Sequence, residues 1–278
     1  MHLRHKVSIY VRESGTPYLV AECGDLPVLS KIRVERGRAQ MSEYDIVHTH
    51  NGVGWTSTVP NQITCEWLDF IRDSQKPLCV LDIGAGFGVA TIPALKGGAR
   101  VIANDIETSH LDAIRKEASD LGYEDHLETV VGRFPGDLAF TGLDSIHCSN
   151  VLHFLPGEEI VAGATRMHSW LRCGGKVFIQ VGTIYAGHIK RLLPQFEERR
   201  SKGVRWAGET DRAREFVLPD FRSATPEFMN YLDGSPLVEA FEAAGFQTLR
   251  AWYYTRTGLP QVFLNDGREH FGYIGCKW

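Results

Sequence analysis

Three glycines at alternating positions form the clearest candidate binding loop in the sequence. Gly84, Gly86 and Gly88 follow an apolar run of strand length, and Asp82 comes two positions before the first of them. Glycine allows a tight turn and a close approach of bare backbone to a ligand, so we expect Gly84, Ala85, Gly86 and Gly88 to line a nucleotide-like cofactor. NAD enzymes also carry glycine loops, but the spacing here differs from the G-x-G-x-x-G that holds a pyrophosphate.

An acidic residue follows the next apolar run. Asp105 ends the segment Val101-Ile-Ala-Asn-Asp105. A carboxylate about 20 positions after the glycine loop can accept hydrogen bonds from both hydroxyls of a ribose. This residue is common to NAD enzymes and to other nucleotide-cofactor enzymes, so the glycine spacing and Asp82 have to distinguish between them.

Two histidines are candidate general bases, because histidine can remove a proton near neutral pH. His153 follows the fourth predicted strand, at the carboxyl edge where open α/β sheets bind ligands, although it could equally pack the loop against the cofactor. His50, two residues after His48, lies in an N-terminal extension that could fold over the site. His48, His50 and His147 form no set of three or four converging ligands with acidic partners, so we predict no metal.

The composition argues against several classes of partner. The chain has 278 residues with 30 Lys and Arg against 34 Asp and Glu, and its formal net charge of −4 provides no basic excess for a nucleic-acid backbone. No uncharged run approaches the ~18 apolar residues of a membrane span. The 6 cysteines are scattered without a C-x-x-C pair. We therefore expect a cytoplasmic protein, a monomer or a homodimer, with neither nucleic acid nor membrane as its partner.

Alternating strands and helices must position these residues. From Cys79 onward, short apolar runs alternate with amphipathic stretches, which is typical of a parallel sheet covered by helices on both faces. We predict strands over 79–83, 100–104, 127–131, 145–148, 176–181, 246–254 and 273–277. We predict helices after Asn61 and near 88–97, 108–121, 157–171 and 235–244, with Gly174 and Gly175 ending the helix near 157–171 in a left-handed turn.

Two segments fall outside this alternation. Residues 1–75 lack it, and we predict that they form an N-terminal extension or lid on the catalytic domain, residues 76–278. Residues from about 184 to 235 interrupt it with Gly, Pro, clustered charge and aromatic side chains, and we predict an inserted cap. The cap and the lid carry the candidate substrate-binding residues, which could instead form a small core of their own: Trp55, Tyr185 and Trp206.

Five segments of the sequence resemble the class I S-adenosylmethionine-dependent methyltransferases. The resemblance covers roughly residues 78–182 and extends to the last two predicted strands. It implies a Rossmann-like α/β fold whose seven-stranded, mostly parallel sheet has the order 3-2-1-4-5-7-6. The matching segments are Leu81-Asp-Ile-Gly-Ala-Gly-Phe-Gly88, Asn104-Asp-Ile106, Val131-Gly-Arg-Phe134, Cys148-Ser-Asn-Val-Leu-His-Phe-Leu155 and Leu171-Arg-Cys-Gly-Gly-Lys176.

The resemblance also implies how S-adenosylmethionine would be held. Asp82 and the glycine backbone would hold its methionine end, and Asp105 its ribose. Ile106 would cover one face of the adenine, Arg133 and Phe134 would flank it, and Asn150 with Val151 would line the floor beneath the sulfonium. The chain departs from many family members at Arg133, where they place an acid that bonds the adenine amino group. A backbone contact from Phe134 is therefore the more cautious expectation.

The function implied is methylation of a hydroxyl or a nitrogen on a small-molecule acceptor, with S-adenosylhomocysteine as the second product. Such an enzyme mainly has to align the acceptor with the methyl group and exclude water. Three alternatives remain: a protein or peptide methyltransferase, a relative that binds S-adenosylmethionine without methylating, and a nicotinamide-dependent oxidoreductase.

Overall fold

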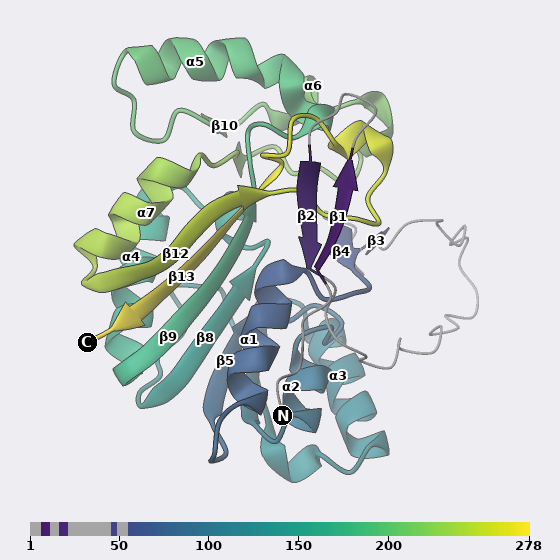
Figure 1. Cartoon of the computed structure of the whole chain (residues 1–278), viewed down its shortest axis with the longest axis vertical. Helices are drawn as coiled ribbons and strands as arrows, with labels where there is room; N and C mark the ends of the chain where they lie inside the picture. Colours follow the sequence, from purple (N-terminus) through teal and green to yellow (C-terminus); the bar gives the residue numbers. More distant parts are fainter. Residues whose placement is uncertain (1–6, 12–16, 22–45, 49–54) are drawn as a thin grey trace. The chain divides into compact units, whose positions relative to one another are not determined.

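A seven-stranded sheet forms the centre of residues 43–278 (Figure 1). Its order is β12-β13-β9-β8-β5-β6-β7, and every neighbouring pair is parallel except those of β13, which runs antiparallel to β9 and β12. Renumbered along the chain, this order is 3-2-1-4-5-7-6, which confirms the predicted Rossmann-like fold. The strands are β5 (Cys79–Ile83), β6 (Arg100–Asp105), β7 (Leu127–Val131), β8 (Leu143–Ser149), β9 (Leu171–Gly182), β12 (Phe246–Tyr254) and β13 (His270–Lys277).

The computed structural model describes residues 7–11, 17–21, 46–48 and 55–278, with side chains from Ser57 onward. The chain divides into two units, residues 1–42 and 43–278. The first contains an antiparallel hairpin, and so does the start of the second; the strands are β1 (Val7–Val11), β2 (Pro17–Ala21), β3 (Ile46–His48) and β4 (Trp55–Ser57). The lid role of residues 1–75 stays a prediction.

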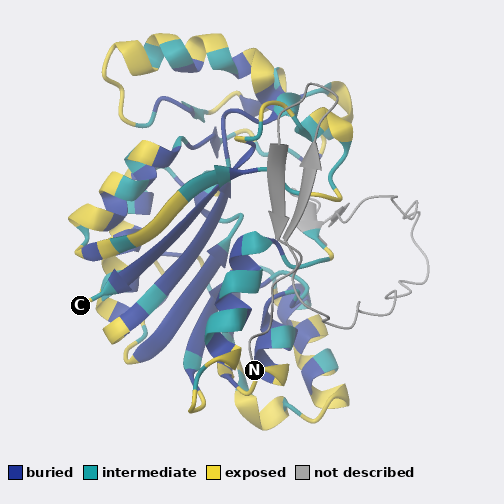
Figure 2. Cartoon of the chain, viewed as in Figure 1, coloured by how far each residue is buried: buried dark blue, intermediate teal, exposed yellow. Residues whose placement is uncertain are grey.

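Helices supply two apolar cores that enclose the sheet. Five helices pack on the sheet; in chain order, the first three belong to one core and the last two to the other. Strands β5 and β8, in the centre of the sheet (Figure 2), are buried except at their half-buried end residues Cys79 and Ser149. The helices are α1 (Gln62–Arg72), α2 (Thr91–Lys96), α3 (Thr108–Asp120), α4 (Gly157–Trp170) and α7 (Gly234–Ala243). None of the helices in the described ranges is long and apolar enough to cross a membrane.

Helix α1 is fastened to strand β8 by polar contacts at its first turns. Asn61 caps the helix as predicted, because its Oδ1 accepts a hydrogen bond from the Thr64 amide at 3.0 Å. Its Nδ2 also donates to Ser149 Oγ at 2.8 Å. One turn further on, the Trp67 indole donates to Ser145 Oγ at 2.8 Å. The helix that precedes the first strand of the sheet is therefore part of the folded core.

Residues 184–232 form short elements around an apolar cluster of their own, which includes Ile189, Phe196, Val217 and Tyr231. This region corresponds to the predicted cap, and its own core explains why its apolar residues follow no strand or helix period. Its elements are η3 (Gly187–Leu192), α5 (Leu193–Ser201), β10 (Glu209–Thr210), α6 (Ala213–Phe216), η4 (Pro219–Phe221) and β11 (Met229–Asn230).

We predict that Asn61→Ala lowers the free energy of unfolding by about 1–3 kcal/mol, since it removes a helix cap and the bond to Ser149. Asn61→Asp keeps an oxygen for the cap but loses the donor, so it should fall between Asn61→Ala and the wild type. The exposed Gln75→Ala is the control, with a change within about 0.5 kcal/mol. Urea unfolding measures all three variants, and an Asn61→Ala protein as stable as the wild type would contradict the prediction.

Candidate functional site

The glycine loop joins β5 to α2 through three residues in the left-handed region. Gly84, Gly86 and Gly88 have φ angles of 68°, 53° and 81°, which residues with a Cβ rarely adopt. A Cβ atom added at Gly84 would lie 2.3 Å from Cγ2 of Val151. The loop that follows β8 is therefore packed directly against the glycine loop, at the carboxyl ends of two neighbouring strands.

The carboxylate of Asp82 lies buried beneath this loop. Its Oδ2 accepts a hydrogen bond from the Thr91 hydroxyl at 2.7 Å, and its Oδ1 lies 2.8 Å from Nδ1 of His147. His147 Nε2 in turn lies 3.0 Å from Thr64 Oγ1. Asp82 thus connects β5 with α2, β8 and, through the imidazole, α1.

Asp105 links the glycine loop to the end of β6. Its Oδ2 accepts a hydrogen bond from the Gly86 amide at 2.9 Å, and its Oδ1 accepts one from the Glu107 amide at 2.9 Å. His110 Nδ1 lies 3.2 Å from the same Oδ1. Burial alone would raise the pKa of Asp105, but the hydrogen bonds from His110 and the two amides outweigh burial and hold that pKa below its usual value. The carboxyl group is therefore ionised at neutral pH.

Asn150 is the non-glycine residue with a positive φ, 59°, among the described residues. Two contacts with Gln180 hold it there. The side-chain amide of Gln180 donates to Asn150 Oδ1 at 2.6 Å, and the backbone amide of Asn150 donates to the backbone carbonyl of Gln180 at 2.9 Å. Ser149 donates to Gln180 Oε1 at 3.0 Å. The fully buried Gln180 thereby fixes the turn at which β8 ends.

The three residues predicted to surround an adenine lie in different environments. Ile106 leaves 64% of its surface exposed next to Asp105. Arg133 is exposed and its guanidinium pairs with Glu159 at 2.8 Å. The ring of Phe134 is buried in the core below α4, where a Cβ at Gly163 would approach it to 2.5 Å. A contact through the Phe134 backbone stays a prediction, whereas its ring is committed to the core.

Residues 80–175 match the family model described as a methyltransferase domain. This part of the chain is a class I, S-adenosylmethionine-dependent methyltransferase domain. The match begins in β5 and ends inside β9, so it contains the glycine loop, Asp105 and Asn150. No curated protein sequence matches the chain.

Solved structures share the fold of the methyltransferase domain at low identity. A S-adenosylmethionine-dependent methyltransferase from Methanosarcina mazei is 17% identical over 79% of this chain and 98% of that chain, with a TM-score of 0.57. The magnesium protoporphyrin IX methyltransferase of Synechocystis PCC 6803, crystallised with S-adenosylhomocysteine, is 16% identical over 78% and 82%, with a TM-score of 0.52. A TehB-like methyltransferase from Corynebacterium glutamicum is 17% identical over 78% and 88%, with a TM-score of 0.50.

The structure describes one of the two predicted catalytic histidines, His153, and places it at the carboxyl edge of the sheet. His153 lies in η2 (Leu152–Phe154), two residues after Val151, and is half-buried. Burial lowers the pKa of His153 to about 4, so its imidazole is uncharged at neutral pH. His50 lies outside the described residues. Among the described residues, no three His, Cys, Asp or Glu side chains converge closely enough to hold a metal ion.

The predicted substrate-binding aromatics do not share one environment. Trp55 lies in β4, and its side chain is outside the described part of the chain. Tyr185 is buried in the cap's own cluster, with ring centroids 6.3 Å from Phe196 and 5.8 Å from Tyr253. Trp206 packs on the first residue of α4, where a Cβ at Gly157 would lie 2.0 Å from the indole Cδ1.

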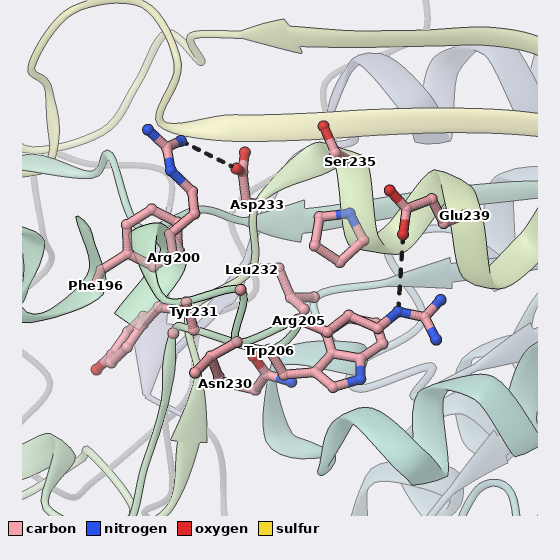
Figure 3. A pocket seen from close by; sticks show the side chains of 15 residues that line it. Phe196, Arg200, Arg205, Trp206, Asn230, Tyr231, Leu232, Asp233, Ser235 and Glu239 are labelled. Carbon is pink, nitrogen blue, oxygen red and sulfur yellow. Dashed lines mark ion pairs between the residues drawn. The ribbon is translucent and has the colours of Figure 1, made fainter. Parts of the chain in front are cut away.

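A cavity of about 380 Å³ lies in the cap beside the start of α7 (Figure 3). Trp206 and Asn230 line it, together with two arginines that already have acidic partners. Arg200 lies 3.7 Å from Asp233, and Arg205 lies 3.9 Å from Glu239. All of its lining residues fall within 196–239, so this cavity belongs to the cap and α7.

Sequence reasoning missed the residues that hold the predicted ones in place. His110 on Asp105, Thr91 on Asp82 and Gln180 on Asn150 lie 5, 9 and 30 positions away from their partners. Gln180 carried one signal, since a polar side chain in the middle of an apolar strand requires a partner. The other two carried none.

We predict that Gly84→Ala destabilises the domain more than Gly98→Ala does. Both positions have a positive φ, 68° and 87°, so both variants pay about 1–2 kcal/mol for the left-handed backbone. Only the Cβ at Gly84 meets another side chain, that of Val151, whereas Gly98 has nothing within 4 Å. The clash should add about 1–3 kcal/mol in thermal or urea unfolding. Equal losses of stability in Gly84→Ala and Gly98→Ala would show that the glycine loop is not in contact with the loop after β8.

Proposed function

We propose that the domain binds S-adenosylmethionine along the edge formed by the glycine loop, Asp105 and Asn150, and transfers its methyl group to a hydroxyl or nitrogen of a small-molecule acceptor. The observation that carries the proposal is the ionised Asp105 carboxylate bonded to the amide of Gly86. This bond places a hydrogen-bond acceptor for the ribose next to the unsubstituted backbone of the glycine loop. The S-adenosylhomocysteine bound to the Synechocystis enzyme, which shares the fold, supports the same assignment.

The residues on this edge fit the parts of such a cofactor. Each oxygen of a carboxylate can accept more than one hydrogen bond, so Asp105 can accept ribose hydroxyls while it keeps its bonds to the loop. The exposed Ile106 offers an apolar face for the adenine. Asp82 would serve the methionine end by fixing Thr91 at the start of α2, directly after the glycine loop, and Asn150 with Val151 would form the floor.

The bound cofactor would supply an electrophilic methyl group on a positively charged sulfur. The chain then has to bind the acceptor in line with this methyl group and keep water out. A proton must also leave the acceptor hydroxyl or amine. The uncharged imidazole of His153 can accept that proton. His153 follows the proposed floor and lies half-buried at the same edge of the sheet.

We predict that Asp105→Ala weakens binding of S-adenosylhomocysteine by about 10-fold to 100-fold, the loss of one or two hydrogen bonds to a charged group. Isothermal titration calorimetry measures the affinity, and circular dichroism with thermal unfolding checks the fold. Asp112→Ala is the matched control, because Asp112 is an exposed acid on α3. A folded Asp105→Ala protein that binds as tightly as the wild type would remove Asp105 from the ribose role.

Methyl transfer itself is tested with S-adenosylmethionine labelled on the methyl group and a panel of small hydroxyl and amine acceptors. We expect labelled product together with S-adenosylhomocysteine. Labelling of peptides in place of small molecules would favour a protein or peptide methyltransferase. Tight binding of the cofactor without turnover on either panel would favour a relative that does not methylate.

A further inference from the structure

Three histidines and a tyrosine gather at the carboxyl edge of β9, beside the proposed cofactor site. We call His153, His188, His270 and Tyr254 the histidine cluster. His270 is the first residue of β13 and pairs with Gly182, the last residue of β9, while Tyr254 pairs with His270 from the other side. The rings of Tyr254 and His270 lie 5.6 Å apart.

The cluster contains buried polar atoms without partners. Nδ1 of His188, Nδ1 of His270 and the hydroxyl of Tyr254 are buried and make no hydrogen bond in the structure. Folded proteins satisfy the great majority of such atoms, so three of them in one cluster require an explanation. A ligand with hydrogen-bonding groups of its own would provide the missing partners.

The cluster is uncharged. Burial and, to a smaller extent, the nearby His153 lower the pKa of His188 to about 4, and burial lowers the pKa of His153 to about 4 as well. Burial, then Arg256, His188 and His153, lower the pKa of His270 well below its usual value. Burial also raises the pKa of Tyr254. All four groups are therefore neutral near pH 7, and each can either donate or accept a hydrogen bond.

A positive charge beside His270 and the aromatic rings beside His188 narrow the class of ligand. The Arg256 guanidinium donates to Ser57 Oγ at 2.7 Å and acts electrostatically on His270, so a protonated amine would be disfavoured here as the imidazolium form is. Phe263, in η5 (Gln261–Phe263), lies 4.3 Å from His188 between ring centroids, and Phe221 lies 5.0 Å from Phe263. These aromatic faces suit a planar ring.

The spacing of the cluster suits an organic molecule better than an ion. The imidazoles influence one another's titration, yet in the described ranges no three such side chains converge on a metal position. A ring-sized ligand can span side chains that a single ion cannot bridge.

The cluster is also held rigidly. Glu269, directly before His270, is buried and accepts hydrogen bonds from the amides of Asn265 at 2.6 Å and Gly267 at 2.9 Å and from the hydroxyl of Thr255. The Thr183 amide donates to the Glu269 carbonyl at 3.0 Å, which ties this turn to the end of β9. His270 is thus positioned by the loop before it, as binding residues generally require.

We propose that the histidine cluster is the acceptor site and that it takes a neutral phenol, whose hydroxyl bonds to the free imidazole nitrogens and the Tyr254 hydroxyl. This inference rests on the proposed methyl transfer. Val151 packs against Gly84, and His153 follows it by two residues, so one member of the cluster lies close to the glycine loop along the chain. In the reaction the phenol oxygen would bond to the methyl carbon, the carbon–sulfur bond would break with its electron pair left on sulfur, and the phenol proton would pass to the imidazole nitrogen that accepts the hydrogen bond of the hydroxyl.

Catechol is the probe, with benzylamine as the cationic comparison, each titrated by ligand-detected NMR with and without S-adenosylhomocysteine. We expect catechol to bind and benzylamine to bind at least tenfold more weakly. Tyr254→Phe should weaken catechol binding about tenfold while leaving the melting temperature unchanged or higher, because the lost hydroxyl has no partner in the protein. His270→Asn tests the imidazole in the same way, and Tyr123→Phe, in the connection between α3 and β7, is the control.

Each outcome decides the assignment. Absence of catechol binding, preference for benzylamine, or unchanged catechol affinity in both Tyr254→Phe and His270→Asn would overturn it. The cofactor is measured separately: a protein that binds S-adenosylhomocysteine but not catechol keeps the proposed function and loses this acceptor site. A protein that binds catechol but not S-adenosylhomocysteine keeps the phenol site and loses the methyl-transfer proposal.

Discussion

The carboxylate of Asp82 has to be paired inside the sheet, and the geometry of the cofactor edge depends on how this is done. An unpaired charge in such a place costs several kcal/mol, so the chain surrounds Asp82 with Thr91 and His147. His147 extends the contact to Thr64 and stacks on Trp67, with ring centroids 4.8 Å apart. Two helices and two strands are therefore fixed at the point where the chain leaves β5 and enters the glycine loop.

A second polar chain does the same for the floor of the site. Gln180 is fully buried in β9, and its side chain is satisfied by Ser149 and Asn150. Because Ser149 also accepts from Asn61, the cap of α1 and the left-handed turn at Asn150 belong to one network. The proposed floor is thus set by three separate elements that meet at the end of β8, and its shape does not depend on the loop sequence alone.

Local pattern was sufficient for the bounds of three strands. The bounds of β5, β7 and β12 are those predicted, because each is a run of strand length that ends before a glycine or a polar residue. The prediction that Gly174 and Gly175 end α4 is wrong: α4 ends at Trp170, and the buried Leu171 already pairs with Leu143 of β8. Gly174 instead supplies a φ of 77° where the register of β8 and β9 shifts, a tertiary requirement that no helix rule contains.

The residues of the site also divide into those that local pattern predicts and those that it does not. Gly84, Gly86 and Asp105 were predicted because strand ends and glycine spacing are local signals, and Asn150 was predicted from the family resemblance. His188 and His270 were not predicted, since each is an isolated histidine without a motif around it, and only the fold brings the end of β13 and the cap together beside β9. Sequence reasoning finds groups that are local to a turn, whereas a cluster assembled across three strands and the cap emerges only from the fold.

The charges along this edge are ordered. Asp105 ends β6, Asp82 lies in β5, and the neutral histidine cluster with Arg256 follows beyond β8, by β9 and β13. A cationic sulfonium is stabilised on the acidic side of such an edge and a neutral acceptor on the other. The proposed transfer removes the positive charge from sulfur. S-adenosylhomocysteine is therefore attracted less strongly to Asp82 and Asp105 than S-adenosylmethionine is. The same ordering that holds the donor therefore weakens the hold on the product, which favours its release.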